Sequence, residues 1–390
     1  MTAAKVFWPI IFLAMSALPL LQSSFRLFPD VKAHGAEMRA LLPSFTLKAF
    51  WDGAFQTQCE KWLSKTIGFR GVFVRTDNQI NLSLFREFSS SSRFQLVLGK
   101  DNYLYGWSYV KYYMEPKAFS DERMNAIVRR LKRVQNALRA RDKGFLLLIS
   151  PSKATLYEEG LPEEYRRRKS PLPSNYDRMM PLLRQAKINV LDSVSMLRDL
   201  KAQGVTAFSR GSTHWTFSSA CLVAAEIKRQ LEGQTGERYP AIPCSPTHHR
   251  ATPVAQDMDL ATLSNLWSTN QFSEPLTYPN PIASTKNASK IPTMSIVGSS
   301  FMWAILHYLD AYKMYSDRAF FYYFNTKHTY PPTRPTPVRR DTFNFDTEIL
   351  DRDLVLIEVN ESVITSVGFG VLPALVKHLN LTQRADGNKD

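Results

Sequence analysis

Five consecutive apolar residues, Phe145-Leu146-Leu147-Leu148-Ile149, directly follow Gly144 and indicate a strand in the middle of a sheet. A run without polar alternation implies burial on both faces, which is typical of a parallel sheet covered by helices. Similar, mostly apolar runs occur at 294–297 and 354–359, and a weaker one at 189–192. We therefore expect an α/β fold with a parallel sheet.

Helices are predicted between these strands. The first begins at Ser120 or Asp121, which suit an N-cap, and reaches about Lys143, with Gly144 as its end signal. Its apolar residues recur at i, i+3, i+4 and i+7, so they form one buried stripe: Met124, Ile127, Val128, Leu131, Val134 and Leu138. Further helices are expected from Trp215 to about Leu231 and from about Phe301. Alternating strands and helices favour right-handed crossovers.

Composition shifts along the chain suggest three parts. Residues 1–29 form a signal anchor, 30–95 a helical neck rich in aromatic residues, and 96–390 the α/β domain. Two stretches, about 233–293 and 325–345, are rich in Pro and resist the strand–helix pattern. Long irregular segments of this kind are functional loops or disordered.

The N-terminus resembles an export signal. Lys5 precedes an apolar run from Val6 to Leu21, and no small-x-small cleavage site follows it. We therefore favour an uncleaved anchor over a cleaved signal. This tethers the domain on the export side of a membrane.

The chain is strongly basic and lacks nucleic-acid motifs. It holds 49 Lys and Arg against 35 Asp and Glu, a formal net charge of +14. Such a surface favours anionic lipid or an acidic polysaccharide, or is simply a solvated basic surface. No helix-turn-helix, zinc-finger or RNP-like pattern is present, so nucleic acid is not expected as a partner.

Three cysteines, Cys59, Cys221 and Cys244, form no CxxC or His/Cys cluster with metal spacing. Either all three are unpaired buried thiols, or Cys221 and Cys244 form one bridge in an oxidising compartment. No metal or nucleotide motif appears, so no cofactor is expected.

Two segments carry side chains suited to acyl transfer. Gly298-Ser299-Ser300-Phe301 lies where a strand should turn into a helix, which would expose Ser300 beside the N–H groups of a helix start. A serine needs a base, and Ser212-Thr213-His214-Trp215-Thr216 offers His214 after the strand-like stretch 205–208. The alternatives are a serine N-cap and a packed histidine beside Trp215.

Together these segments resemble the alginate O-acetyltransferase family, whose members carry D-x-H-W-T and, later, G-D-S-F. Other pieces agree in order, each by resemblance alone: Gly68-Phe69-Arg70, the stretch from Gly99 to Tyr105, Ser150-Pro151-Ser152-Lys153, and the stretch from Leu356 to Glu361. The resemblance covers about residues 50–380. It implies an SGNH-like three-layer domain on the periplasmic side of the inner membrane. Such a domain moves acetyl groups onto exopolysaccharide hydroxyls, with a multi-spanning membrane partner as acetyl donor.

The same resemblance assigns site residues. Ser300 would form the acetyl-enzyme and His214 would act as its base, while Ser299, Lys153, Asn360 and Trp215 would contact an anionic or neutral polysaccharide. Two family aspartates are replaced, by Ser212 and Ser299. Ser212 could orient His214 as a neutral acceptor, or Asp192 or Asp257 could take that place.

Three functions stay open at this point. The chain could be an O-acetyltransferase, a degenerate subunit that binds polysaccharide or a partner, or an esterase that releases acetate to water. The intact Ser300 and His214 favour the first and third, and the replaced aspartates favour the second. A final aromatic run, 320–324, is predicted as a buried strand rather than a sugar platform.

Overall fold

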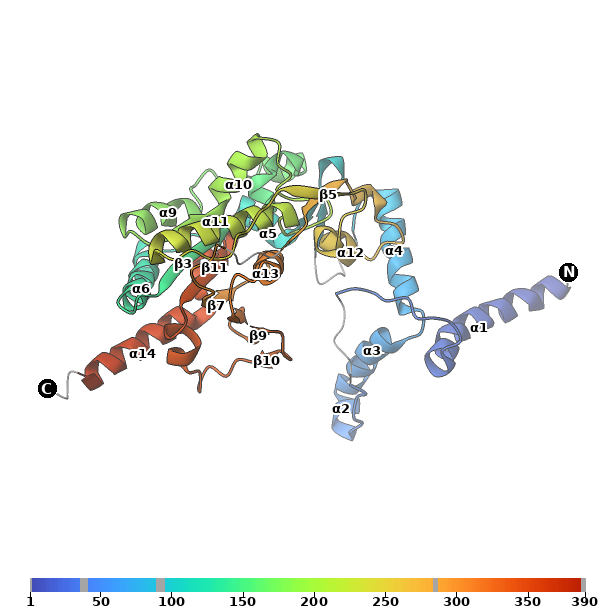
Figure 1. The fold of residues 1–390 in the computed structure, drawn as a ribbon. Coiled ribbons are helices and arrows are strands. Elements are labelled where there is room, and N and C mark those ends of the chain that lie inside the picture. The colour runs from blue at the N-terminus through green and yellow to red at the C-terminus, as the bar shows by residue number, and fades with distance from the viewer. Residues whose placement is uncertain (1, 36–40, 89–94, 283–286, 387–390) are drawn as a thin grey trace. The chain divides into compact units, whose positions relative to one another are not determined.

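The computed structural model describes residues 2–35, 41–88, 95–282 and 287–386. Two compact units are distinguished (Figure 1). The first comprises Met1–Leu98 with Leu260–Gln271, and the second comprises Gly99–Asp259 with Phe272–Asp390. Each unit is described by itself.

The first unit is almost entirely helical. Its elements are α1 (Thr2–Phe25), α2 (Leu47–Trp51), α3 (Ala54–Thr66), α4 (Arg70–Phe85) and the short strand β1 (Leu96–Leu98). Side chains of α4 fasten the 260–271 segment, because Asn78 donates to the Ser264 carbonyl at 2.8 Å and Arg75 donates to the Leu266 carbonyl. Helix α1 leaves large apolar side chains exposed, among them Trp8 and Phe12.

The second unit is built on a sheet whose strands, within the described residues, follow the order β10-β9-β8-β7-β11-β3-β4. Their bounds are β3 (Gly144–Ser150), β4 (Val190–Asp192), β7 (Thr293–Gly298), β8 (Asp317–Tyr322), β9 (Thr326–Tyr330), β10 (Thr336–Pro337) and β11 (Leu354–Asn360). The five strands from β8 to β4 are parallel, whereas β9 pairs antiparallel with β8, and β10 pairs antiparallel with β9. The expected all-parallel sheet is therefore corrected to a mixed one, because β9 returns beside β8 through a tight turn.

Helices cover both faces of this sheet, which confirms the predicted three layers. One face packs against α10 (Ser193–Ala202), α11 (Phe217–Thr235) and α13 (Met302–Ala311). The other packs against α6 (Asp121–Arg139), α9 (Asn175–Gln185), the 3-10 segment η6 (Glu361–Gly370) and α14 (Val371–Asp386). Both cores consist of alternate residues of the same strands: Leu146 and Leu148 face one way, Phe145 and Leu147 the other.

Most local predictions are confirmed by these bounds. Ser120 caps α6, and the six residues of its predicted apolar stripe are all buried. Two details differ. Gly144 begins β3 instead of ending a helix, and the strand-like stretch 205–208 makes only an isolated bridge between Phe208 and Trp215.

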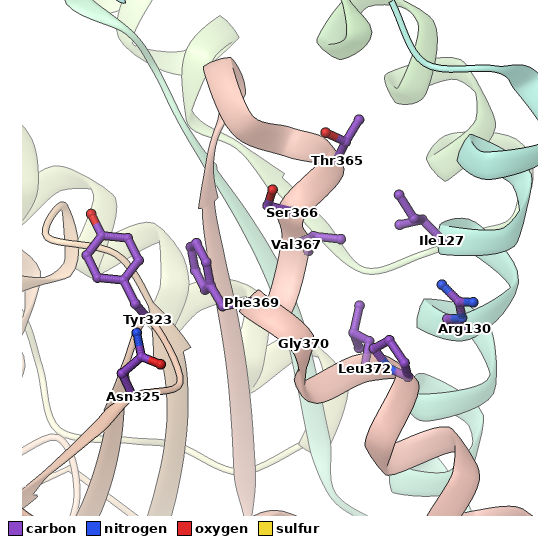
Figure 2. Close-up of a pocket in the computed structure, with 11 residues that line it drawn as sticks. Ile127, Arg130, Tyr323, Asn325, Thr365, Ser366, Val367, Phe369, Gly370 and Leu372 are labelled. Carbon is purple, nitrogen blue, oxygen red and sulfur yellow. The ribbon is translucent and has the colours of Figure 1, made fainter. Parts of the chain in front are cut away.

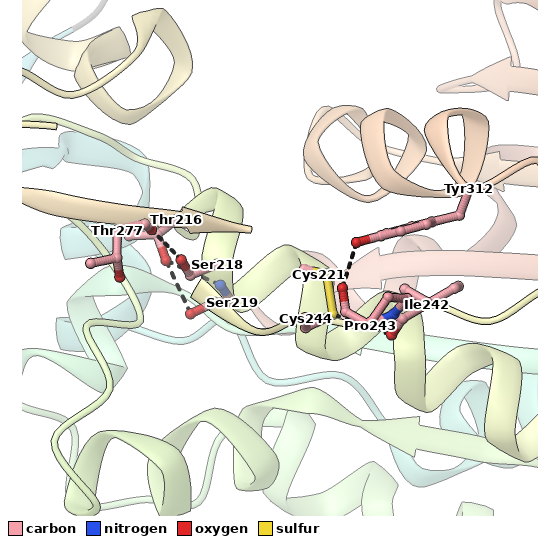
Figure 3. Close-up of a disulfide and its surroundings, with 9 residues drawn as sticks. All are labelled: Thr216, Ser218, Ser219, Cys221, Ile242, Pro243, Cys244, Thr277 and Tyr312. Carbon is pink, nitrogen blue, oxygen red and sulfur yellow. Dashed lines mark hydrogen bonds between the residues drawn. A yellow bond between two sulfur atoms is a disulfide. The ribbon is translucent and has the colours of Figure 1, made fainter. Parts of the chain in front are cut away.

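The Pro-rich stretch 233–293 contains a β-hairpin, β5 (Pro246–Arg250) with β6 (Leu276–Pro279). Several contacts join this stretch to α11 and to the C-terminal end of α13 (Figure 3). Cys244 is disulfide-bonded to Cys221 on α11, Ser218 donates to the Thr277 carbonyl, and Tyr312 donates to the Pro243 carbonyl. Of the two interpretations of the cysteines, the structure supports the Cys221–Cys244 bridge.

Shorter elements complete the second unit: β2 (Leu104–Gly106), α5 (Trp107–Met114), α7 (Lys153–Leu156), α8 (Glu163–Arg166), α12 (Asp259–Leu263, whose later residues belong to the first unit), the 3-10 segments η1 (Lys100–Asn102), η2 (Glu158–Gly160), η3 (Ala255–Met258) and η4 (Asn270–Phe272, at the edge of the first unit), and the π-helical turn η5 (Asp346–Leu350). The carboxyl ends of β7, β11 and β3 meet at one edge of the sheet, where ligands bind in open α/β folds.

Among the described residues, one helical stretch, Glu361–Asn380, is long and apolar enough to cross a membrane. Its Val371, Leu372 and Leu375 are buried in the core of the second unit, so it serves as a core element there. The N-terminal anchor stays a prediction.

Candidate active site

Ser300 lies in the turn between β7 and α13, at the carboxyl edge of the sheet. The turn needs glycine at 298, since a Cβ there would lie 2.7 Å from Met302 Cγ and 3.1 Å from Glu358 Oε2. Glu358 on β11 accepts a hydrogen bond from the Ser299 N–H at 2.6 Å and another from Ser150 Oγ at 2.6 Å. Burial raises the pKa of the Glu358 carboxyl, and these two donors oppose that shift. The turn is thus fastened to the neighbouring strand.

His214 bridges this serine and a carboxylate. Its Nε2 lies 2.8 Å from Ser300 Oγ, and its Nδ1 lies 2.5 Å from Asp259 Oδ2. The other carboxylate oxygen of Asp259 accepts the Thr213 N–H at 2.8 Å. The imidazole meets the Phe301 ring edge-on with centroids 4.8 Å apart. His214 and Asp259 keep 13% and 21% of their side-chain surface exposed, so the pair is accessible from solvent.

The orienting carboxylate corrects the prediction made for Ser212. Ser212 is fully buried, and its hydroxyl donates to the His214 backbone carbonyl at 2.6 Å instead of to the ring. The two substitute acids are also misplaced. Asp192 caps α10 and accepts from Tyr176, and Asp257 accepts from Tyr278 at 2.8 Å. Sequence reasoning reached Asp257 but missed Asp259 two residues later.

Lys153 lies beneath the histidine loop and cannot contact a substrate, because it is only 2% exposed. Its Nζ lies 2.6–2.9 Å from four backbone carbonyls, those of Leu104, Ser209, Arg210 and Ser212. Burial lowers its pKa to about 7, against the opposing charges of Asp259 and Glu274. The predicted substrate contact is therefore corrected to a support for the loop that carries His214.

The other three predicted substrate contacts are buried as well. Trp215 is fully buried and donates from Nε1 to the Phe301 carbonyl at 3.1 Å. Asn360 is 2% exposed and donates to the Pro151 carbonyl at 2.8 Å. Ser299 is 3% exposed, and its hydroxyl accepts the Phe301 N–H at 3.3 Å. All three fix the backbone around Ser300 and His214 rather than offering side chains to a ligand.

A serine hydroxyl, an imidazole and a carboxylate linked in series form the arrangement that activates a serine toward carbonyl carbon. Residues 96–306, just over half of the chain, match the family model for the SGNH hydrolase-like domain, acetyltransferase AlgX. The chain belongs to this family. Its resemblance to the alginate O-acetyltransferases is thereby confirmed at family level.

Solved structures that match this chain include three bacterial proteins. The O-acetyltransferase domain of Pseudomonas putida AlgJ is 18% identical, with 70% of this chain and 93% of that one covered at a TM-score of 0.43. Pseudomonas aeruginosa AlgX is 14% identical, with 72% of this chain and 67% of that one covered at a TM-score of 0.42. Bacillus cereus PatB1 with a sulfonyl adduct is 11% identical, with 70% of this chain and 99% of that one covered at a TM-score of 0.45. Among curated proteins, none matches this chain by sequence.

In this member of the AlgX acetyltransferase family, Tyr323 is a further residue of the site that sequence reasoning missed. Its hydroxyl lies 3.5 Å from Ser300 Oγ. The residue follows β8, and both Tyr323 and Phe324 have φ near +50°, a conformation that costs about 1 kcal/mol or more for a non-glycine residue. The aromatic run was predicted as a buried strand, but this turn directs Tyr323 toward the serine.

Tyr323 also lines a pocket of about 520 Å³ (Figure 2). Figure 2 shows its ring facing Phe369 of η6, and the two centroids are 5.1 Å apart. The wall on α6 contributes Ile127 and Arg130. The pocket thus offers an aromatic face, hydroxyl groups and one guanidinium, and it shares Tyr323 with the site.

Among the residues that the structure describes, no group of three or more His, Cys, Asp or Glu side chains is placed to hold a metal ion. The functional groups at the site are those of a serine, a histidine, a carboxylate and a tyrosine.

Proposed function

We propose that this protein is an O-acetyltransferase that transfers acetyl groups to hydroxyls of a secreted polysaccharide through an acetyl-Ser300 intermediate. The observation that carries the proposal is the hydrogen-bonded series from Ser300 through His214 to Asp259. The series supports an active enzyme over a degenerate subunit, because the carboxylate missing from position 212 is supplied from position 259. Membership of the acetyltransferase family supports the choice of group.

In the first step, Ser300 Oγ attacks the carbonyl carbon of the donor's acetyl group while His214 Nε2 accepts the serine proton. Asp259 holds the Nδ1–H tautomer and stabilises the imidazolium that forms. Collapse of the tetrahedral intermediate breaks the bond to the donor, and the leaving group takes the proton from His214. The product of this step is an acetyl ester on Ser300.

In the second step, a sugar hydroxyl takes the donor's place. His214 accepts its proton as the oxygen attacks the acetyl-serine carbonyl, and the same proton returns to Ser300 Oγ when the ester breaks. Water in place of the sugar would give hydrolysis, so an enclosed acceptor pocket favours transfer. The pocket beside Tyr323 is our candidate for that acceptor site.

The negative charge of both intermediates needs hydrogen-bond donors. The Ser299 N–H is already bound to Glu358, so it is unsuitable. The Ser300 N–H at the start of α13 is suitable by position, because the N-terminus of a helix favours negative charge. The Tyr323 hydroxyl, 3.5 Å from Ser300 Oγ, is a second candidate.

We further propose that α1 anchors the protein in the inner membrane, with the second unit in the periplasm. The exposed apolar side chains of α1 support this location, as does the Cys221–Cys244 disulfide, which belongs to an oxidising compartment. A multi-spanning membrane protein would then deliver the acetyl donor, and exopolysaccharide would be the acceptor.

The test measures release of a chromogenic leaving group from an acetyl ester by the full chain, with and without an oligosaccharide acceptor. We expect wild-type turnover to be lost in both Ser300→Ala and His214→Ala, and acetylated sugar to appear by mass spectrometry when acceptor is present. Circular dichroism checks that each variant is folded.

Two outcomes would contradict the proposal. A folded wild-type protein without turnover would favour the degenerate binding subunit. Turnover that releases only free acetate at saturating acceptor would favour the esterase.

A further inference from the structure

The first unit gathers large apolar side chains at its surface around α2. Six of them, between 42% and 88% exposed, form a cluster that we call the apolar tip: Leu41, Leu42, Phe45, Leu47, Phe50 and Trp51. From position 41 to position 59 the sequence contains two charged residues, Lys48 and Asp52. An exposed apolar patch of this size marks a surface that meets another molecule or a membrane.

The apolar tip is a folded element. Thr46 caps α2, since its hydroxyl accepts the Ala49 N–H at 3.1 Å and its carbonyl accepts the Phe50 N–H at 2.9 Å. The Phe45 ring contacts the rings of Phe50 and Phe55, with centroids 5.9 and 5.2 Å apart. A backbone whose N–H groups are bonded internally can approach a lipid phase without leaving donors unpaired.

Nothing in the first unit buries α2 or the helix that follows it. Neither α2 nor α3 contains a buried residue, whereas α4 buries Gly71, Asn78 and Leu82. Helices as short as α2 and α3, with 5 and 13 residues, are marginal in water without packing. Their stability therefore calls for a partner that covers the apolar tip.

The other end of α3 is fastened to the end of α1. Ser23 Oγ of α1 accepts the Gly68 N–H at 2.7 Å, two residues beyond the end of α3. This contact needs glycine, because a Cβ at position 68 would lie 2.5 Å from the Pro19 carbonyl oxygen. With 24 residues, α1 extends about 36 Å, slightly more than the ~30 Å hydrocarbon core of a bilayer. An α1 that spans the membrane would thus bring this junction to the membrane surface, and the apolar tip lies at the far end of α3, a helix about 20 Å long.

We propose that the apolar tip inserts into the interface of the bilayer that α1 crosses, as a second membrane contact that holds the first unit against the surface. The inference rests on the proposed anchoring by α1 and goes beyond it. Apolar faces of interfacial helices enter the boundary between headgroups and acyl chains by about 5–10 Å. Exposed lysines, Lys48 beside the tip and Lys61 and Lys65 on α3, would meet anionic headgroups.

The composition of the apolar tip favours lipid over a protein partner. A protein interface carries about one hydrogen bond per 100–200 Å² among its apolar contacts. The tip offers six apolar side chains, and the Thr46 hydroxyl among them is already used in the helix cap. Trp51 and Lys48 suit the polar boundary of a bilayer, where indole rings lie at headgroup level and lysine ammonium groups reach into water.

The experiment reports the surroundings of single side chains in the full chain, reconstituted in vesicles of phosphatidylcholine and phosphatidylglycerol. In a Cys59→Ser background the remaining cysteines are disulfide-bonded, so one new cysteine can carry a fluorescent label. Leu47→Cys probes the tip, and Phe12→Cys probes α1. Leu172→Cys is the matched control in the second unit, because Leu47 and Leu172 are both 71% exposed.

We expect nitroxide-bearing lipids to quench the labels at positions 12 and 47, and iodide in the water to quench only the label at 172. Adding Phe50→Ser and Trp51→Ser should raise iodide quenching at position 47 about tenfold, since burial of aromatic side chains drives the insertion. These substitutions remove no core contact, because α2 has no buried residue. Leu172→Ser in the same background should leave quenching at 47 unchanged.

The outcomes separate the apolar tip from the anchor. A label at 47 that stays open to iodide, while lipid quenches the label at 12, would overturn the inserted tip and leave the anchor standing. Lipid quenching at 47 but not at 12 would refute the anchor alone. A label at 47 that is shielded from iodide yet unquenched by lipid would show a protein contact in place of the bilayer, and lipid quenching at 172 as strong as at 47 would show that any exposed leucine suffices. Either result would overturn the proposal, whereas acetyl transfer is tested separately by ester turnover.

Discussion

Asp259 makes two contacts that fix the base of the site at once. One carboxylate oxygen holds the His214 ring, and the other holds the backbone N–H of Thr213. Asp259 therefore positions both the ring and the loop that carries it. The hydroxyl of Ser212, which lies closer in sequence, donates to the His214 backbone carbonyl instead.

We predict that Asp259→Asn lowers kcat for acetyl ester turnover by about 10³–10⁴, because the amide no longer selects the Nδ1–H tautomer or stabilises the imidazolium. Ser212→Ala should lower kcat less than tenfold and cost about 1 kcal/mol of stability through one lost hydrogen bond. Steady-state kinetics and denaturant unfolding measure the two effects. The reverse ranking would restore Ser212 as the orienting group.

Ser300 and His214 could be predicted from local motifs, whereas Asp259 and Tyr323 could not. A motif reports residues that are near in sequence, and Asp259 lies 45 positions after His214 in an irregular segment. Tyr323 belongs to an apolar run that resembles a strand. Its exit from the strand depends on two successive left-handed residues, which no side-chain pattern signals.

At the scale of elements, two buried side chains fasten the loops that carry the site. Lys153, at the start of α7, gathers the carbonyls of the histidine loop. Glu361, after the end of β11, accepts the Ser152 N–H at 2.6 Å and the Thr155 hydroxyl. Lys153 and Glu361 are ionisable side chains at buried positions, so each makes the free energy of unfolding depend on pH.

Burial raises the pKa of Glu361 to about 7, above its value of about 4.5 in the unfolded chain. The folded state therefore binds more protons between about pH 4.5 and 7, and the free energy of unfolding falls as pH rises through that window. The full loss is about 3 kcal/mol at most. Glu361→Gln keeps the acceptor oxygen without the charge, so it should flatten this fall.

Denaturant unfolding at about pH 5 and about pH 7.5 measures the difference for wild type, Glu361→Gln and the exposed control Glu164→Gln. Burial also raises the pKa of Asp257 to about 7. In every variant, Asp257 therefore leaves a smaller fall in the free energy of unfolding as pH rises. An unchanged slope in Glu361→Gln would show that this carboxyl ionises normally in the folded protein.

The elements that were predicted are those with strong periodicity. The continuous apolar strands and the amphipathic α6 show their burial directly in the sequence. The hairpin β5–β6 and the antiparallel β9 and β10 lie in Pro-rich stretches without clean alternation, so their pairing is decided by tertiary contacts. The antiparallel edge of the sheet followed from those contacts and not from the pattern.

At the scale of the whole molecule, the Cys221–Cys244 disulfide joins α11 to the Pro-rich stretch 233–293, which supplies Asp259. We predict that replacing both cysteines by serine lowers the free energy of unfolding by about 3 kcal/mol, since a bridge between residues 23 positions apart removes about that much conformational entropy from the unfolded chain. Unfolding with and without reductant should show the same loss for wild type.

Cys59→Ser is the matched control, because Cys59 is a free cysteine in the first unit. It should leave the unfolding transition and its response to reductant unchanged. A response to reductant that persists in the double serine variant would mean that the bridge is not its source.

The strand order has a consequence for how the protein is made. β11 pairs between β7 and β3, yet it is synthesised last of the three, and it brings Glu358 to the turn that holds Ser300. A chain that emerges N-terminus first therefore leaves β7 and β3 each with one unpaired edge until residues 354–360 appear. A nascent chain that stalls before residue 354 therefore carries its nucleophile without the carboxylate that fixes the turn around it.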